Sequence, residues 1–525
     1  MNAKELARSL TIFSLCVVLV VAPIEKHTTS LWLAAQAMAL ISALFMVLAS
    51  EWAERGRRTL LRHPLTLALM QSALILIAVR VTAQLQHGAE QALTTVGFFI
   101  KDYAGILFLS LAAWNGRRHL RHSDLADSWL MKATDALIWV WLGLVLLSAA
   151  ASQDPAISFE HLRKETGIYL ILYLICLEAA SRMADFQRLI RMLAVVGLCA
   201  TVLAGVLYHY YDTRIEETSG YSVCEWMRSQ ELIEHRDPQP GQEFSVVWPA
   251  GHPSRLASVA IVFTFSLLAG AATMQRGELK TLWGLAAIVP AYVIFLSRTP
   301  EAVLALAVGL VCLWCMLLWL FACGLKKRWL IPVLLLPLVA GAGVYFLTPP
   351  ETLARARQLL QTELHSNPDP VVQEKLQGWR IAVHLTGQNP GLGIGHGWEN
   401  FENADQQLLE EPQALKNISH AQNNLLEGVV ENGLPAGGVW LILHLLFAAV
   451  LIRAFLNRNL NLRLRYMLAV ICSMHLSLSC LGLVDFTLRD RAGAIIWIVT
   501  ALALALARQT GRSEEEPNQT GSEPV

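Results

Sequence analysis

The sequence NPGLGIGHGWENF (residues 389–401), followed by SHAQNNLLEGVVENGLPAGG (residues 419–438), lies between two strongly apolar blocks. The surrounding stretch, 371–438, is too polar to lie inside a bilayer. It holds Arg380, a glycine-rich turn and His420, which are groups that suit an anionic substrate at a membrane surface. We therefore interpret this stretch as the lid and catalytic face of a polytopic membrane enzyme.

Composition places the whole chain in the membrane class. Of its 525 residues, 54% are hydrophobic and 16% are charged, whereas about 25% are charged in a typical soluble domain. Crossing ~30 Å of hydrocarbon takes ~20 apolar residues, and many windows of the sequence satisfy this requirement. The formal net charge is zero, so no overall basic field suggests a nucleic-acid partner.

Hydropathy predicts an all-α, polytopic integral membrane protein with about 12–14 transmembrane helices. We expect spans near residues 9–24, 31–50, 64–83, 92–113, 133–151, 165–180, 188–210, 253–273, 281–297, 301–323, 329–347, 434–452, 466–484 and 491–508. The short connections rich in Lys and Arg all fall on one side, which the positive-inside rule makes the cytoplasm. Both termini are then cytoplasmic, and the long polar loops face the periplasm of a Gram-negative inner membrane.

This topology divides the chain into six parts. They are the N-terminal transmembrane helices (1–210), a first periplasmic loop (211–251), transmembrane helices of the catalytic core (252–347), a large helical periplasmic loop (348–433), C-terminal transmembrane helices (434–508) and a disordered cytoplasmic tail (509–525). Within the large loop, residues 350–364 and 371–385 have the spacing of amphipathic helices that lie along the surface.

The glycine-rich turn follows the second of these loop helices. Asn389-Pro390 ends the helix, and glycines then stand at 391, 393, 395 and 397. Glycine permits positive backbone dihedrals and a close approach of the backbone to a ligand. We take Gly393 and Gly395 as candidate supporting residues, with an ordinary turn as the alternative.

The segment that follows suggests a helix start. Ser419 followed by Gln422 matches a capping box, which predicts Ser419 as the N-cap and His420 in the first turn. The positive end of a helix dipole disfavours imidazolium, so His420 would stay neutral and able to accept a proton. The same helix start would offer backbone donors to a phosphate. The alternative is a capped helix whose histidine has no chemical role.

Three arginines are candidates for binding an anion. Arg255 begins an apolar helix, Arg298 lies between two apolar runs, and Arg380 lies on the expected loop helix. Charge at a membrane boundary is a functional hypothesis by default, and guanidinium forks match phosphate oxygens bidentately, so a diphosphate is the natural ligand. The alternatives are snorkelling for Arg255 and Arg298, and simple solvation for Arg380.

Metal binding has weak support. Glu231, Glu234 and His235 in the first long loop form a partial ligand set, and no Asp-x-Asp pair accompanies them. We read them as a solvated face and predict no metal and no cofactor.

Three segments together resemble the shared core of the O-antigen ligase and polymerase superfamily, which includes O-linked protein oligosaccharyltransferases. They are SRTPEAVLAL (297–306), GWR (378–380) with the glycine-rich turn, and the segment 419–438, and the resemblance covers roughly residues 245–485. It implies a glycosyltransferase of the GT-C type, a multi-helix membrane bundle with a periplasmic lid. The implied donor is a glycan on undecaprenyl diphosphate, and the implied chemistry is metal-independent with inversion at the anomeric carbon.

The resemblance also implies residue roles. His420 would be the essential loop histidine and general base, Arg255 and Arg380 the essential arginines, and Arg298 a further diphosphate-binding arginine. Ser419, Gln422, Asn423, Gly393 and Gly395 would support them. The family's histidine is usually followed directly by Asn or Ser, so a register that matches on Asn423 would instead put Gln422 in the histidine position.

We expect an O-antigen ligase that transfers the glycan to lipid A-core oligosaccharide in lipopolysaccharide biosynthesis. One long lid and no additional C-terminal acceptor-binding domain favour this over a polymerase or a protein O-oligosaccharyltransferase. A lipid-linked glycan transporter is the alternative from a different class, and it would place charges through the bundle centre rather than at one face. The expected partners are the lipid-linked donor, a lipid A-core or glycan acceptor, and membrane lipids, with no nucleic acid.

Overall fold

The computed structural model describes residues 129–166, 169–170, 173, 176–177, 180, 183–215, 253–297, 299–322, 370–408, 420–458, 460–485 and 490–512. Every regular element among them is a helix, so the predicted all-α class is confirmed for this part of the chain. The spans predicted near 9–24, 31–50, 64–83, 92–113 and 329–347, and the loop helix predicted at 350–364, lie outside the described residues. The total of 12–14 spans therefore stays a prediction.

Six helical segments of the described chain are long and apolar enough to cross a membrane. They lie in α9 (Met183–Ile215), α11 (Pro253–Thr273), the consecutive helices α12 (Gly277–Ala286) and α13 (Ile288–Leu296), α14 (Pro300–Ala322), α19 (Asn424–Leu456) and α20 (Leu462–Val484). Shorter apolar stretches occur in α6 (Trp129–Ala151) and α21 (Asp490–Arg512). The chain is a polytopic membrane protein, as the sequence predicted.

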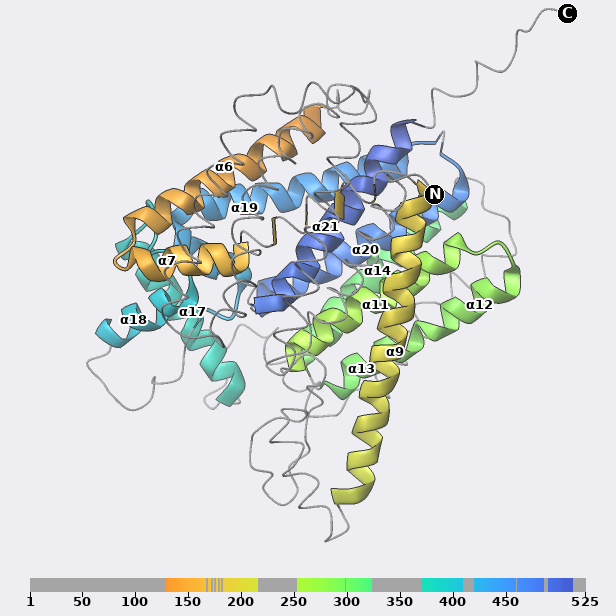
Figure 1. Cartoon of the computed structure of the whole chain (residues 1–525), viewed down its shortest axis with the longest axis horizontal. Coiled ribbons are helices and arrows are strands. Elements are labelled where there is room, and N and C mark those ends of the chain that lie inside the picture. The colour runs from red at the N-terminus through yellow and green to blue at the C-terminus, as the bar shows by residue number, and fades with distance from the viewer. Residues whose placement is uncertain are drawn as a thin grey trace, which may run out of the picture.

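A group of more polar elements packs at one end of this bundle. It comprises α7 (Pro155–His161), the π-helix η4 (Leu162–Thr166), α17 (Pro370–Gln388) and α18 (Trp398–Leu408). Figure 1 shows α7, α17 and α18 gathered at the left of the view, around one end of α6 and α19. The helix α17 confirms that residues 371–385 are helical, and we call 370–408 the lid segment.

The centre of the bundle is α20, which packs against α11, α14, α19 and α21, while α6 lies along α19 and α9 along α11. Gly309 allows α14 to pack closely against α20, because a Cβ at this position would lie only 2.9 Å from the Cβ of Ser477 on α20. The hydroxyl of Ser477 in turn donates to the carbonyl of Ala305, at 2.7 Å. Small residues therefore let α14 and α20 approach each other within the apolar core.

Successive helices cross the bundle in alternate directions, so the starts of α11, α14 and α19 share one end with the terminus of α20. Side-chain contacts fix this end. The amide of Asn423 donates to the carbonyl of Leu483, and Lys375 of the lid segment pairs with Glu301 and donates to the carbonyl of Val484. We call it the lid end of the bundle.

The helix α19 is broken near its start. Gly433 has φ +81° and ψ +166°, a non-helical conformation, and Pro435 follows it. Hydropathy placed the start of a span at 434, but the helix begins at Asn424. The segment 424–432 is therefore a short helix of its own at the lid end, and we call it the outer segment of α19.

Candidate functional site

The break in α19 leaves main-chain groups without helical partners. Pro435 has no N–H with which to bond the carbonyl of Glu431. The N–H of Leu434 donates to the carbonyl of Pro390 in the glycine-rich turn, at 2.9 Å, instead of to a carbonyl of its own helix. Buried backbone groups need partners, so another part of the chain must supply them.

The glycine-rich turn supplies those partners. The N–H groups of Ile394 and Gly395 donate to the carbonyls of Val430 and Glu431, at 2.9 and 3.0 Å. The hydroxyl of Ser148, at the end of α6, donates to the same Glu431 carbonyl at 2.7 Å. The turn is thus bound to the outer segment of α19 by main-chain hydrogen bonds, and Ser148 joins the end of α6 to the same carbonyl. We call the place where these three parts meet the junction.

The glycines have the predicted conformation but a different neighbour. Gly393, Gly395 and Gly397 have φ of +72°, +116° and +109°. At Gly397 a Cβ would lie 2.5 Å from the ring of His161 on α7, which explains why a larger residue does not fit. This backbone approaches α7 and α19 closely, and the N–H groups of Ile394 and Gly395 donate to protein carbonyls, while the predicted approach to a ligand stays a prediction.

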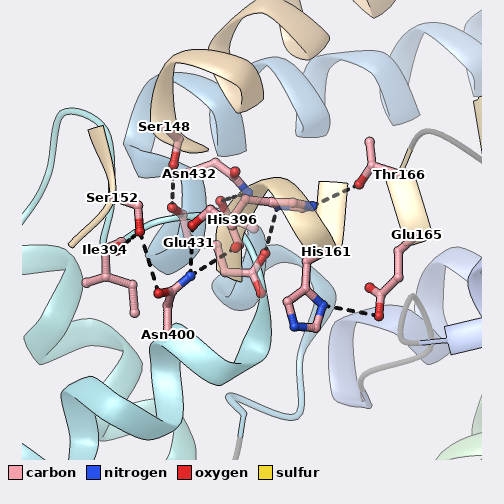
Figure 2. A network of polar contacts seen from close by, with 12 residues as sticks. Ser148, Ser152, His161, Glu165, Thr166, Ile394, His396, Asn400, Glu431 and Asn432 are labelled. Atoms are coloured by element: carbon pink, nitrogen blue, oxygen red, sulfur yellow. Dashed lines mark hydrogen bonds and ion pairs between the residues drawn. The ribbon is translucent and has the colours of Figure 1, made fainter. Parts of the chain in front are cut away.

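A buried imidazole lies at the centre of this junction (Figure 2). Nδ1 of His396 lies 3.2 Å from a carboxylate oxygen of Glu431, and Nε2 lies 2.9 Å from the hydroxyl of Thr166 on η4. All three residues are buried. A carboxylate accepts hydrogen bonds and does not donate them, so a neutral ring in this position would carry its proton on Nδ1, and its Nε2 would accept from the threonine.

Asn400 completes the junction from α18. Its amide nitrogen donates to the carbonyl of His396 at 2.9 Å and to the hydroxyl of Ser158 at 3.0 Å. One amide therefore ties α18 to the glycine-rich turn and to α7, and it fixes the main chain that carries His396.

A second buried histidine faces carboxylates on both sides. Nδ1 of His161 lies 3.5 Å from Glu165, and Nε2 lies 3.6 Å from Glu399 of α18. Burial lowers the pKa of His161, but the Glu165 carboxylate beside it, together with Glu431 and Glu399, outweighs this and raises the pKa above its usual value. Each ring nitrogen of His161 faces a carboxylate, which can only accept a hydrogen bond. The imidazolium form, which carries a proton on both nitrogens, therefore suits this position.

The sequence analysis did not select these two histidines or their partners. His396 and Glu431 lie within the sequences quoted first but were read as part of a turn and a helix. His161 and Glu165 have the i, i+4 spacing that brings side chains together on a helical turn, and this spacing could have identified them as a pair. Nothing local could reveal that residues 161–166 meet residues 396 and 431.

His420 lies just before α19 rather than in its first turn. The helix begins at Asn424, and its N-cap is Asn423, whose side-chain oxygen accepts from the N–H groups of Leu425 and Leu426 at 2.9 and 3.0 Å. The predicted capping box is therefore wrong, and Ser419 itself lies outside the described residues. Asn423 is a better cap because its tertiary bond to the end of α20 holds it in place.

The loop that carries His420 is held to the outer segment of α19. The N–H of Ala421 donates to the carboxylate of Glu427 at 2.5 Å. Gln422 has φ +49°, and its N–H donates to Nδ1 of His420 at 3.2 Å. A neutral His420 with Nδ1 as acceptor carries its proton on Nε2. His420 is partly exposed at the lid end.

The predicted arginines lie in different surroundings. Arg255 is partly exposed in the first turn of α11, at the lid end. Arg380 is exposed on α17, and Arg298 lies outside the described residues. Five residues turn a helix by roughly 140° beyond one full turn, so Arg380 faces away from Lys375, which is buried against Glu301.

Metal-ligating side chains do not converge in the part of the chain that the structure describes: no group of three or more His, Cys, Asp or Glu side chains there could hold an ion. The charged groups that do meet at the lid end form carboxylate–imidazole and carboxylate–lysine contacts.

The comparison with known families agrees with the motifs. A family model described as O-antigen ligase matches residues 285–441. No curated protein matches the chain. The matched region runs from α12 through α14 and the lid segment to the break in α19, and it includes His420, Asn423, His396 and Glu431. Enzymes of this family are glycosyltransferase-like and act on lipid-linked glycans and their acceptors. The match over residues 285–441 thus supports membership of the chain in the O-antigen ligase superfamily.

Proposed function

We propose that this protein is an inverting glycosyltransferase that moves a glycan from undecaprenyl diphosphate to the lipid A-core oligosaccharide on the periplasmic face of the inner membrane. The observation that carries the proposal is the O-antigen ligase match, which spans the lid segment and the His420 loop. The contacts of that loop with the outer segment of α19 and the end of α20 support a site at the lid end.

The reaction needs two things from the protein. An acceptor hydroxyl attacks the anomeric carbon and loses its proton, while the bond from that carbon to the diphosphate oxygen breaks and leaves negative charge on the diphosphate. Arg255, Arg380 and Arg298 would stabilise that charge as fixed cations. His420 would take the proton, a contribution that is typically worth ~10² to 10⁴ in rate.

The orientation of His420 adds a condition to this mechanism. Its Nδ1 accepts the N–H of Gln422 at 3.2 Å, so this contact must open before Nδ1 can take the proton of the acceptor hydroxyl. Gln422 is therefore proposed to hold the imidazole until the acceptor arrives.

The test is transfer by purified protein in EDTA, with undecaprenyl-diphosphate glycan as donor and lipid A-core as acceptor. Wild type should form product, whereas His420→Ala and Arg380→Ala should lose roughly 100-fold or more in rate. His384→Ala is the matched control, because His384 is an exposed histidine on α17.

The other outcomes identify different functions. Extension of the lipid-linked glycan by wild type would indicate a polymerase. Transfer to a protein acceptor would indicate an O-oligosaccharyltransferase, and movement of the intact donor across vesicles without transfer would indicate a transporter. A requirement for added divalent metal would contradict the metal-independent chemistry.

A further inference from the structure

The break in α19 separates the outer segment, 424–432, from the membrane-spanning part of the helix. Gly433 is non-helical, so helical continuity does not fix how the outer segment is oriented. Its orientation must come from side-chain and main-chain contacts at its two ends.

One end of the outer segment is held by His396. The imidazole bridges Glu431 at 3.2 Å and Thr166 at 2.9 Å, and the neighbouring Ile394 and Gly395 bond the freed carbonyls. Thr166 belongs to η4, which is far from α19 in sequence, so the ring links the outer segment to an independent element.

The other end carries the His420 loop. Glu427 precedes Glu431 by one helical turn and therefore lies on the same face of the helix. Its carboxylate accepts the N–H of Ala421, the residue after His420. A rotation of the outer segment about its axis would move Glu427 and the attached loop together.

We propose that His396 and Glu431 are positioning residues for His420: by fixing the outer segment of α19 to η4, they set where the imidazole of His420 lies. Neither residue contacts the reacting atoms. The expected effect of His396 on the rate of glycan transfer rests on the proposed function. Its expected effect on the orientation of the outer segment rests on the contacts alone.

The experiment compares full-length wild type with His396→Ala, His396→Gln and His384→Ala in lipid nanodiscs. Glutamine offers both an N–H for Glu431 and a carbonyl for Thr166, so it should restore part of the bridge. Two readouts are taken: backbone hydrogen exchange of peptides covering 421–433, and kcat and KM for glycan transfer.

In His396→Ala, exchange across 421–433 should accelerate roughly tenfold because a buried bridge is lost. The value of kcat should fall roughly 10-fold to 100-fold while the KM for the donor changes little, since misplacement of a reacting group affects the chemical step. His396→Gln should recover part of both losses, and His384→Ala should match wild type.

Two results would overturn the proposal. Unchanged exchange in His396→Ala would show that the ring does not hold the segment, whatever happens to transfer. Faster exchange with an unchanged kcat would show that the segment does not position His420. If wild type transfers no glycan, the proposed function fails, and exchange alone decides whether His396 holds the outer segment.

Discussion

At the scale of single residues, the two buried histidines of the junction differ in the groups that face their ring nitrogens. His396 meets one carboxylate and one hydroxyl, which satisfy a neutral ring. His161 meets a carboxylate at each nitrogen, and a neutral ring would point one lone pair at an acceptor. The pKa of His161 is raised, so this residue makes the stability of this end of the molecule depend on pH.

Stability should depend on pH through His161. Its pKa in the folded protein is raised, so the contribution of its contacts is fully present below the unfolded value of about 6.5 and is lost as pH rises through the folded pKa. We expect the unfolding midpoint of wild type to fall from about pH 6.5 upward.

The variant His161→Gln should remove most of this dependence, whereas the exposed His384→Gln should retain it. Thermal unfolding in detergent at several pH values would measure this. Parallel pH profiles for wild type and His161→Gln would contradict the assignment.

At the scale of elements, the break at Gly433 joins α19 to the glycine-rich turn. A Cβ at Gly433 would lie 2.2 Å from the carbonyl oxygen of Gly391, and φ is +81°. The conformation and the contact both require glycine, because the turn and the helix exchange main-chain hydrogen bonds at this point.

Gly433→Ala should destabilise the protein by about 1–3 kcal/mol or more, since it combines backbone strain with a main-chain clash. Gly428, five residues earlier in the same helix, has open space where the Cβ of an alanine would lie. Gly428→Ala should therefore be neutral or stabilise by up to about 1 kcal/mol. Denaturant unfolding of the two variants checks this, and similar losses in both would argue against the break as the cause.

The start of α19 illustrates what local patterns can and cannot predict. The residues Ser419 and Gln422 suggested a cap, yet the helix begins after Asn423, which bonds to the carbonyl of Leu483. Both Ser419 and Asn423 are residue types that cap helices well, and the contact of Asn423 with the end of α20 favours Asn423. Hydropathy likewise placed the span after 433 because Glu427 and Glu431 reduce the apolar character of the outer segment, although it is helical.

At the scale of the whole molecule, one buried ion pair attaches the lid segment to the bundle. Lys375 of α17 lies 2.5 Å from Glu301 at the start of α14 and 3.3 Å from the carbonyl of Val484 at the end of α20. Both charged side chains are buried, so each compensates charge on the other in an apolar setting.

Lys375→Met should cost about 3–5 kcal/mol, because it leaves the Glu301 carboxylate buried and uncompensated. Adding Glu301→Met should recover much of that loss, since a buried pair replaced by apolar groups is often neutral. The control is Lys280→Met, at an exposed lysine on α12. Unfolding midpoints of the three variants test this, and an unrecovered loss in the double variant would contradict pairwise compensation.

The overall architecture was predictable and the junction was not, for one physical reason. The described spans follow from apolar composition, because any helix in lipid must bond its backbone internally and present apolar side chains. The bond between Thr166 and His396 joins residues 230 positions apart. Composition and periodicity carry no information about such a pair, so the sequence could not predict which residues surround the glycine-rich turn.

The distance in residues from the break in α19 to the N-cap determines where the His420 loop lies along the helix axis and on which side of that axis. From Gly433 to Asn424 the outer segment is roughly 14 Å long along its own axis. One residue more or fewer in that segment would raise or lower the His420 loop by about 1.5 Å and swing it by about 100° around the helix axis. The apolar span that follows Gly433 would be unchanged, so the number of residues between the N-cap and the break sets where the His420 loop lies relative to that span.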